Sequence, residues 1–249
     1  MAQGNRLRIV PITAARGVFK DRYGRDLVNS RPSFTVSYVN VNAVPEERSD
    51  VFDTLSTILG TPRFLEVAGE NHIVNDKGQI YARKTPMVKL DEDNIVTVTD
   101  KGSGQNLIPS EIDASSGKIT LGVKEGTEVA VSYSYDTFEN KIKIQGFKKY
   151  IPVRLKTDVD FQTVALIEEK RLSGVVVEVE PTRNYLYGSM GSHIFGYVGE
   201  VSQEELEILK KEGYRPGDLV GKMGLEKVLE EHLKGTDGGQ QVEVTATGT

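Results

Sequence analysis

Ser115 and Lys118 have the spacing of a serine nucleophile and the lysine that activates it. In such a site the serine opens a helix beside a deep cleft. Here Ser115, Ser116 and Gly117 form a run typical of a turn, and the strand-like residues 119–121 follow it. The context therefore predicts a hairpin turn and not a catalytic serine.

Other residue types that do chemistry are sparse. The chain has no cysteine, which excludes a thiolate nucleophile and thiolate metal ligands. The three histidines, His72, His193 and His232, share no spacing that would gather them on one metal ion. We expect His193 to make a structural hydrogen bond. We predict no metal site and no cofactor, because the glycines at 235–239 also lack the Lys-Ser/Thr of a phosphate loop.

Composition excludes two further classes of function. The chain has 249 residues, with 31 basic and 36 acidic side chains and a net charge of -5. This balance argues against a nucleic-acid partner, which would call for a basic surplus. No apolar run approaches the roughly 18 residues of a membrane-spanning helix.

The outer thirds of the chain mix helix and strand patterns. Apolar and small polar residues alternate over 33–38, which predicts a half-buried strand that pairs with strands of the C-terminal section. Helices are predicted over 49–59, after Asp158 or Asp160, and over 225–233. Ser202 and Glu205 have the spacing of a capping box, and 175–180 reads as a strand.

The middle third is rich in strands and turns. Residues 95–99 and 129–135 are strand-like, and Ile142 and Ile144 continue the alternation. We expect a small antiparallel β unit here, either a sandwich or a partial barrel. Its tyrosines at 133 and 135 are interpreted as strand packing.

Three motifs, widely separated along the chain, combine glycines with charged and aromatic residues. Gly24 suits the positive φ of a tight turn, and the opposite charges predict one shared network that fixes geometry. The motif residues are Arg16, Gly17, Asp21, Arg22 and Gly24 in the first, Arg183, Tyr185, Gly188, His193, Gly196 and Tyr197 in the second, and Gly221, Gly224, Leu225 and Glu226 in the third.

In this order the motifs resemble those of the pedestal, or dimerisation, module of class B penicillin-binding proteins. The first is similar to R-G-x-x-x-D-R-x-G-x-x-L, the second to R-x-Y-P-x-G followed by H-x-x-G-Y, and the third to G-x-x-G-L-E. The resemblance covers about residues 5–60 and 146–249. It implies an α+β fold with an elongated pedestal built from 1–60 and 146–249. The β-rich stretch 61–145 lies outside the resemblance and is interpreted as an insertion.

The resemblance also implies a biological setting. The parent would be a bacterial enzyme that cross-links peptidoglycan, anchored by an N-terminal helix on the extracytoplasmic face of the membrane. The pedestal would position the parent's own transpeptidase domain beyond residue 249. Its other expected partners are a second copy of itself and a membrane-embedded glycosyltransferase of the SEDS type.

The chain itself is expected to be non-catalytic. The family's chemistry needs S-x-x-K, S-x-N and K-T-G elements. No S-x-N occurs in this sequence, and Lys84-Thr85 precedes a proline. Two rival hypotheses remain: a self-contained enzyme that uses Ser115 and Lys118, and an adhesion or glycan-binding module that works through the β insert.

Overall fold

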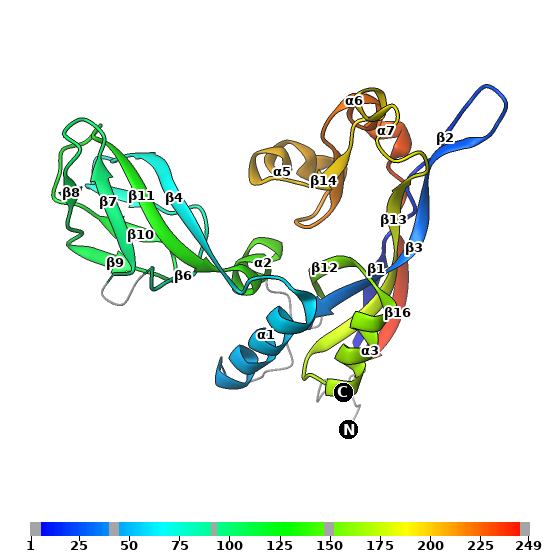
Figure 1. The fold of residues 1–249 in the computed structure, drawn as a ribbon, viewed down its shortest axis with the longest axis horizontal. Helices are drawn as coiled ribbons and strands as arrows, with labels where there is room; N and C mark the ends of the chain where they lie inside the picture. The colour runs from blue at the N-terminus through cyan, green and yellow to red at the C-terminus, as the bar shows by residue number, and fades with distance from the viewer. Residues whose placement is uncertain (1–5, 40–44, 91–93, 147–151, 245–249) are drawn as a thin grey trace. The chain divides into compact units, whose positions relative to one another are not determined.

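The computed structural model divides the chain into two compact units. One is discontinuous and comprises Met1–Val41 and Lys148–Thr249; the other, Asn42–Phe147, is inserted between its segments (Figure 1). The structure describes residues 6–39, 45–90, 94–146 and 152–244. Helices and antiparallel sheets occur together, which confirms the predicted α+β class.

The discontinuous unit is built on the strand predicted over 33–38. β3 (Asp26–Tyr38) lies between β12 (Val153–Val159) and β13 (Val175–Tyr185), and both partners come from the C-terminal section as expected. The two-residue β2 (Phe19–Lys20) forms a hairpin with the start of β3. Val36 and Tyr38 of β3 are fully buried as predicted. Ser33, Thr35 and Ser37 on the opposite face are buried as well, so this end of the strand is covered on both faces and is not half-buried.

Short elements complete this unit. β1 (Arg6–Ile12) pairs with β16 (Gly238–Val244), and β14 (Val198–Glu200) pairs with β15 (Leu219–Gly221). α3 (Phe161–Lys170) is capped by Asp160. The capping box at Ser202 is confirmed at the start of α5 (Gln203–Leu209), which the 3₁₀ turn Lys210–Glu212 follows. The remaining helices are α4 (Ser192–Phe195), α6 (Gly224–Val228) and α7 (Glu230–Leu233).

The inserted unit contains two antiparallel sheets around one core. One has the order β4-β11-β7-β8, with β6 also paired to β11, and the other has the order β5-β10-β9. Buried apolar residues from both sheets form a common cluster, as in a sandwich. The strands are β4 (Phe64–Ile73), β5 (Gln79–Tyr81), β6 (Met87–Val88), β7 (Val96–Asp100), β8 (Asn106–Leu107), β9 (Glu111–Asp113), β10 (Lys118–Thr120) and β11 (Glu128–Asp136).

The predicted continuation of strand pairing at Ile142 and Ile144 is wrong. Residues Thr137–Gln145 form helix α2, because Asp136 caps it by accepting from the amides of Phe138 and Glu139. Phe138 and Ile142 then lie one turn apart on its buried face.

The first segment of the fold ends earlier than the expected boundary at residue 60. The predicted helix is present as α1 (Pro45–Leu59), but it belongs to the inserted unit. Its Phe52 ring lies 5.3 Å from that of Phe138 on α2, and Arg48 pairs with Glu139. No helix in the described ranges is long and apolar enough to cross a membrane.

Candidate functional site

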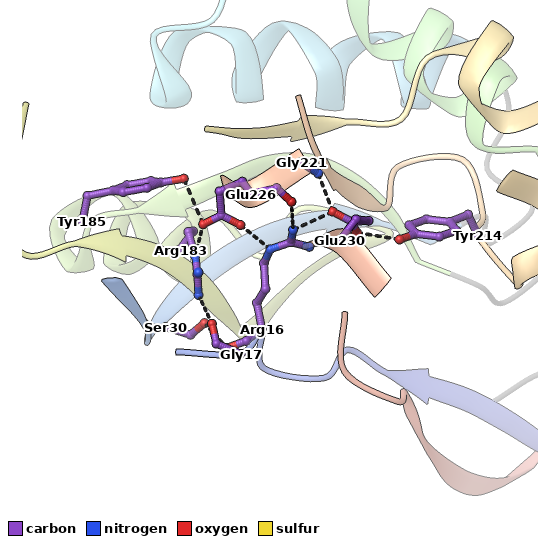
Figure 2. Close-up of polar contacts among 9 residues, drawn as sticks. All are labelled: Arg16, Gly17, Ser30, Arg183, Tyr185, Tyr214, Gly221, Glu226 and Glu230. Carbon is purple, nitrogen blue, oxygen red and sulfur yellow. Dashed lines mark hydrogen bonds and ion pairs between the residues drawn. The ribbon is translucent and has the colours of Figure 1, made fainter. Parts of the chain in front are cut away.

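The three sequence motifs meet at one fully buried carboxylate, that of Glu226 on α6. Arg16 donates from Nε to one carboxylate oxygen over 2.7 Å, and Arg183 donates from Nε to the other over 2.7 Å (Figure 2). The Tyr185 hydroxyl, from the same strand as Arg183, lies 3.4 Å from the second oxygen. Each of the three motifs thus contributes a charged side chain to one contact, which we call the Glu226 joint.

A second carboxylate extends the joint. Glu230 accepts from the Arg16 guanidinium over 3.0 and 2.5 Å, so Arg16 bridges Glu226 and Glu230. The Tyr214 hydroxyl donates to Glu230 over 2.5 Å, and the Gly221 amide donates to it over 2.7 Å (Figure 2). Arg16 also donates to the backbone carbonyl of Glu226.

Backbone contacts fasten the first motif to the same place. The amide of Gly17 donates to the carbonyl of Leu233 over 2.8 Å, and its carbonyl accepts from Arg183 Nη1 over 2.6 Å. A Cβ atom at Gly17 would lie 3.2 Å from the Leu233 side chain. The close approach of these segments therefore favours glycine at position 17.

Glycines also allow the second and third motifs to interlock. Gly196 has a φ of +76°, and a Cβ atom there would lie 1.8 Å from the carbonyl oxygen of Met223. A Cβ atom on Gly224 would lie 2.5 Å from the carbonyl oxygen of Ile194, and one on Gly221 would lie 2.1 Å from that of Glu226. Gly196, Gly221 and Gly224 are thus contact points between backbones, whereas Gly24 and Gly188 have no such close neighbour.

Asp21 and Arg22 lie outside the joint, although the sequence placed them in the shared network. Asp21 pairs with Arg25 in the β2–β3 turn and accepts from the amides of Tyr23 and Arg25. The Arg22 guanidinium lies 5.0 Å from the Tyr23 ring centre. Gly24 has the expected positive φ, +82°. These partners are local, so this part of the motif shapes the hairpin.

The side chains of the other predicted residues take no part in the ion pairs of the joint. Gly188 has a φ of +59°, Leu225 is half-buried and Tyr197 is exposed. His193 is exposed on α4, and its ring makes no hydrogen bond with the described residues, which differs from the expected structural bond.

Two members of the joint, Glu230 and Tyr214, were not among the predicted site residues. Glu230 follows Glu226 by four residues, which places both on one side of consecutive helical turns. This four-residue spacing was the sequence signal that could have identified Glu230. Tyr214 follows the loop after α5, and only the fold brings it to Glu230.

In the joint, each buried carboxylate is balanced by a neighbouring arginine and by hydrogen-bond donors. Burial would raise the pKa of Glu230, but hydrogen bonds from Arg16, Tyr214 and the Gly221 amide outweigh it and hold that pKa below its ordinary value. Burial and the bond to Glu230 raise the pKa of the Tyr214 hydroxyl. Within the described residues no group of three or more His, Asp or Glu side chains is arranged to hold a metal ion.

The lowered pKa of Glu230 predicts an acid-sensitive unit. As the pH falls, the unfolded chain takes up this proton first, near the ordinary pKa of about 4.3. The stability that Glu230 contributes is complete above that value and is lost as the pH falls through its folded pKa. We expect Glu230→Gln to have a lower free energy of unfolding in urea at pH 6 than the unsubstituted chain. Between pH 6 and pH 3, that free energy should fall less steeply for the variant. The exposed Glu231→Gln should follow the unsubstituted chain, and parallel curves for all three proteins would contradict the assignment.

The Ser115–Lys118 pair does not have the geometry of a nucleophile and its base. The Ser115 hydroxyl donates to Asp113 over 2.7 Å in the turn between β9 and β10, as the turn prediction implies. Hydrogen bonds from Ser115 and Ser116 hold the pKa of Asp113 well below its usual range. The Lys118 ammonium pairs instead with Glu111 at 3.1 Å.

Comparison with known proteins gives a consistent result. The family model described as the penicillin-binding protein dimerisation domain matches residues 11–249. The peptidoglycan D,D-transpeptidase MrdA of Acinetobacter baumannii is 34% identical over 113 residues, 45% of this chain and 16% of that protein. The protein of the same name from Haemophilus influenzae is 23% identical over 253 residues, 99% of this chain and 28% of that protein.

A solved structure shares the fold. Penicillin-binding protein 2B of Streptococcus pneumoniae superposes with a TM-score of 0.54 at 18% identity, over 98% of this chain and 38% of that one. The chain therefore spans well under half the length of each of these three proteins.

Proposed function

Because this chain belongs to the dimerisation-domain family of class B penicillin-binding proteins, we propose that it is the non-catalytic pedestal that positions a peptidoglycan transpeptidase domain. The activity belongs to the parent protein. The relatives that carry it are named D,D-transpeptidases, and this chain corresponds to a minor part of each.

The Glu226 joint is the observation that supports a positioning role. Its charged groups are paired with one another inside the protein, and the Glu226 side chain has no exposed surface. A cluster of this kind offers no free nucleophile or base to a substrate. It joins three segments of the chain. The segments of Arg16 and Arg183 are more than 150 residues apart, and those of Arg183 and Glu226 about 40, so the joint makes the unit rigid at that point.

The rival hypothesis of a self-contained enzyme has little geometric support. An active serine needs its hydroxyl beside a base, and the Ser115 hydroxyl is bonded to Asp113, whose carboxylate anchors a turn. No feature of the described part of the inserted unit specifically supports the hypothesis of a glycan-binding module. Binding to isolated peptidoglycan that disappears when 42–147 is deleted would revive it.

The proposal extends to place and partners. The pedestal would lie on the extracytoplasmic face of the membrane, held by an N-terminal helix of the parent. Its partners would be the parent's own transpeptidase domain, a second copy of the chain and a SEDS-type glycosyltransferase in the membrane.

Labelled penicillin separates positioning from catalysis. This chain alone should not be acylated, and Ser115→Ala should change nothing. A parent protein that lacks the pedestal should react with soluble penicillin at a rate within about twofold of the whole protein, because the nucleophile is elsewhere. Cross-linking of peptidoglycan by the same protein should fall at least about tenfold. Equal loss of both activities, or unchanged cross-linking, would contradict the proposal.

A further inference from the structure

The inserted unit has a long strand at the edge of its larger sheet. β4 (Phe64–Ile73) pairs with β11 along one side, and no other described strand pairs with its opposite side (Figure 1). Its ten residues exceed the usual strand length of about five or six. An unpaired edge presents free backbone N–H and C=O groups that can pair with another extended chain.

Apolar side chains are exposed at both ends of this edge strand. Phe64, Leu65 and Ile73 are 49%, 43% and 68% exposed. They are three of the five large apolar side chains that are exposed among the described residues of the inserted unit; the other two are Tyr81 and Ile108. Backbone groups and exposed apolar side chains on one strand are the two components of recognition by strand addition.

The edge is protected over only part of its length. Residues 64–73 contain no lysine, arginine or proline. A bulge at Gly69, where φ is +65° and the register with β11 shifts, interrupts the strand. It leaves Phe64–Val67 as a straight segment, on which both Leu65 and Glu66 are exposed.

Charge indicates which kind of chain fits. Residues 42–147 carry 17 acidic and 11 basic side chains, a net charge of -6, whereas the rest of the chain is close to neutral. Two copies paired through this edge would bring two such units and their Glu66 carboxylates together, which is unfavourable. An extended segment with basic residues would instead be attracted by the negative potential of the inserted unit.

We propose that the β4 edge of the inserted unit binds an extended segment of a partner protein in which apolar residues alternate with lysine or arginine. The segment adds a strand beside Phe64–Val67. Its apolar side chains pack beside Leu65 and Val67 on one face of the sheet, and its basic side chains lie beside Glu66 on the opposite face, which Phe64 shares. This inference does not depend on the transpeptidase-positioning role.

Synthetic peptides on the whole chain test the proposal. The probe is an acetylated peptide of about eight residues that alternates valine with lysine, the length of a typical strand. Matched peptides carry glutamate in place of lysine, or proline at every second position. Binding is followed by fluorescence anisotropy, and backbone amide NMR locates it. We expect the lysine peptide alone to bind and to shift the amides of 64–67.

Substitutions then localise the surface. Leu65→Lys and Glu66→Lys should each weaken binding at least about tenfold, because they place a positive charge on the edge. Ile108→Lys, at a side chain 91% exposed after β8, is the matched control and should bind as before. Amide shifts confined to other strands, equal binding of the glutamate peptide, or self-association that Leu65→Lys abolishes would each overturn the proposal.

Discussion

Glu226→Gln is expected to lower the free energy of unfolding of the discontinuous unit by roughly 3 to 5 kcal/mol, the cost of breaking a buried ion pair from one side. The side chain has no exposed surface and pairs with Arg16 and Arg183, which are 11% and 3% exposed. Glutamine keeps the shape and removes the charge. Arg183, which is 3% exposed, then has little access to water, and Arg16 keeps only Glu230 as its carboxylate partner.

Urea unfolding monitored by hydrogen exchange of the β3 and β13 amides measures this loss within the affected unit. Arg31→Gln is the control, because it breaks an ion pair with Asp158 in which both side chains are 46% exposed. That change should cost at most about 1 kcal/mol. A similar loss for both variants would show that the Glu226 joint is no more important than a surface pair.

Arg183 makes the expected effect of Glu226→Gln larger. Its Nη2 atom is buried and has no hydrogen-bond partner in the described part of the chain. The guanidinium lies 5.3 Å from the centre of the Phe19 ring, and Phe19 in turn lies 5.6 Å from Phe195. Aromatic faces stabilise the cation, but Glu226 supplies its counter-charge.

The sequence predicted those features that short-range patterns determine. The alternation over 33–38 identified the central strand β3, because successive side chains of a strand point to opposite faces. The burial of its polar face at Thr35 and Ser37 was not predicted. Ser202 and Glu205 identified the start of α5, because both hydrogen bonds of a capping box are local. The resemblance to the family's motifs, and not a local pattern, indicated three of the segments that meet at Glu226.

Features that depend on tertiary partners were missed. Ile142 and Ile144 are two residues apart, which suits a strand, but Asp136 and the contact with Phe52 select a helix. Asp21 was assigned to the shared network because of its charge, but it pairs instead with Arg25, which is only four residues away. Charge type alone does not tell which partner a carboxylate finds.

Gly196→Ala is expected to destabilise the same unit by a comparable amount, through sterics rather than charge. Gly196 ends α4 with φ +76° and ψ -150°, a region of backbone conformation that is essentially restricted to glycine. The added Cβ would also lie 1.8 Å from the Met223 carbonyl oxygen. Strain and overpacking each cost about 1 to 3 kcal/mol, so we expect a loss of roughly 3 to 5 kcal/mol.

Gly188→Ala separates the two causes. Gly188 also has a positive φ, +59°, but a Cβ atom there would have no heavy atom within 4 Å. Its substitution therefore costs backbone strain alone, about 1 to 2 kcal/mol. If urea unfolding gave the same loss for both glycines, the close approach of α4 to Met223 would not be what holds the second and third motifs together. A loss at position 196 that is clearly larger supports that contact, and with it the view that these glycines build the rigid joint around Glu226.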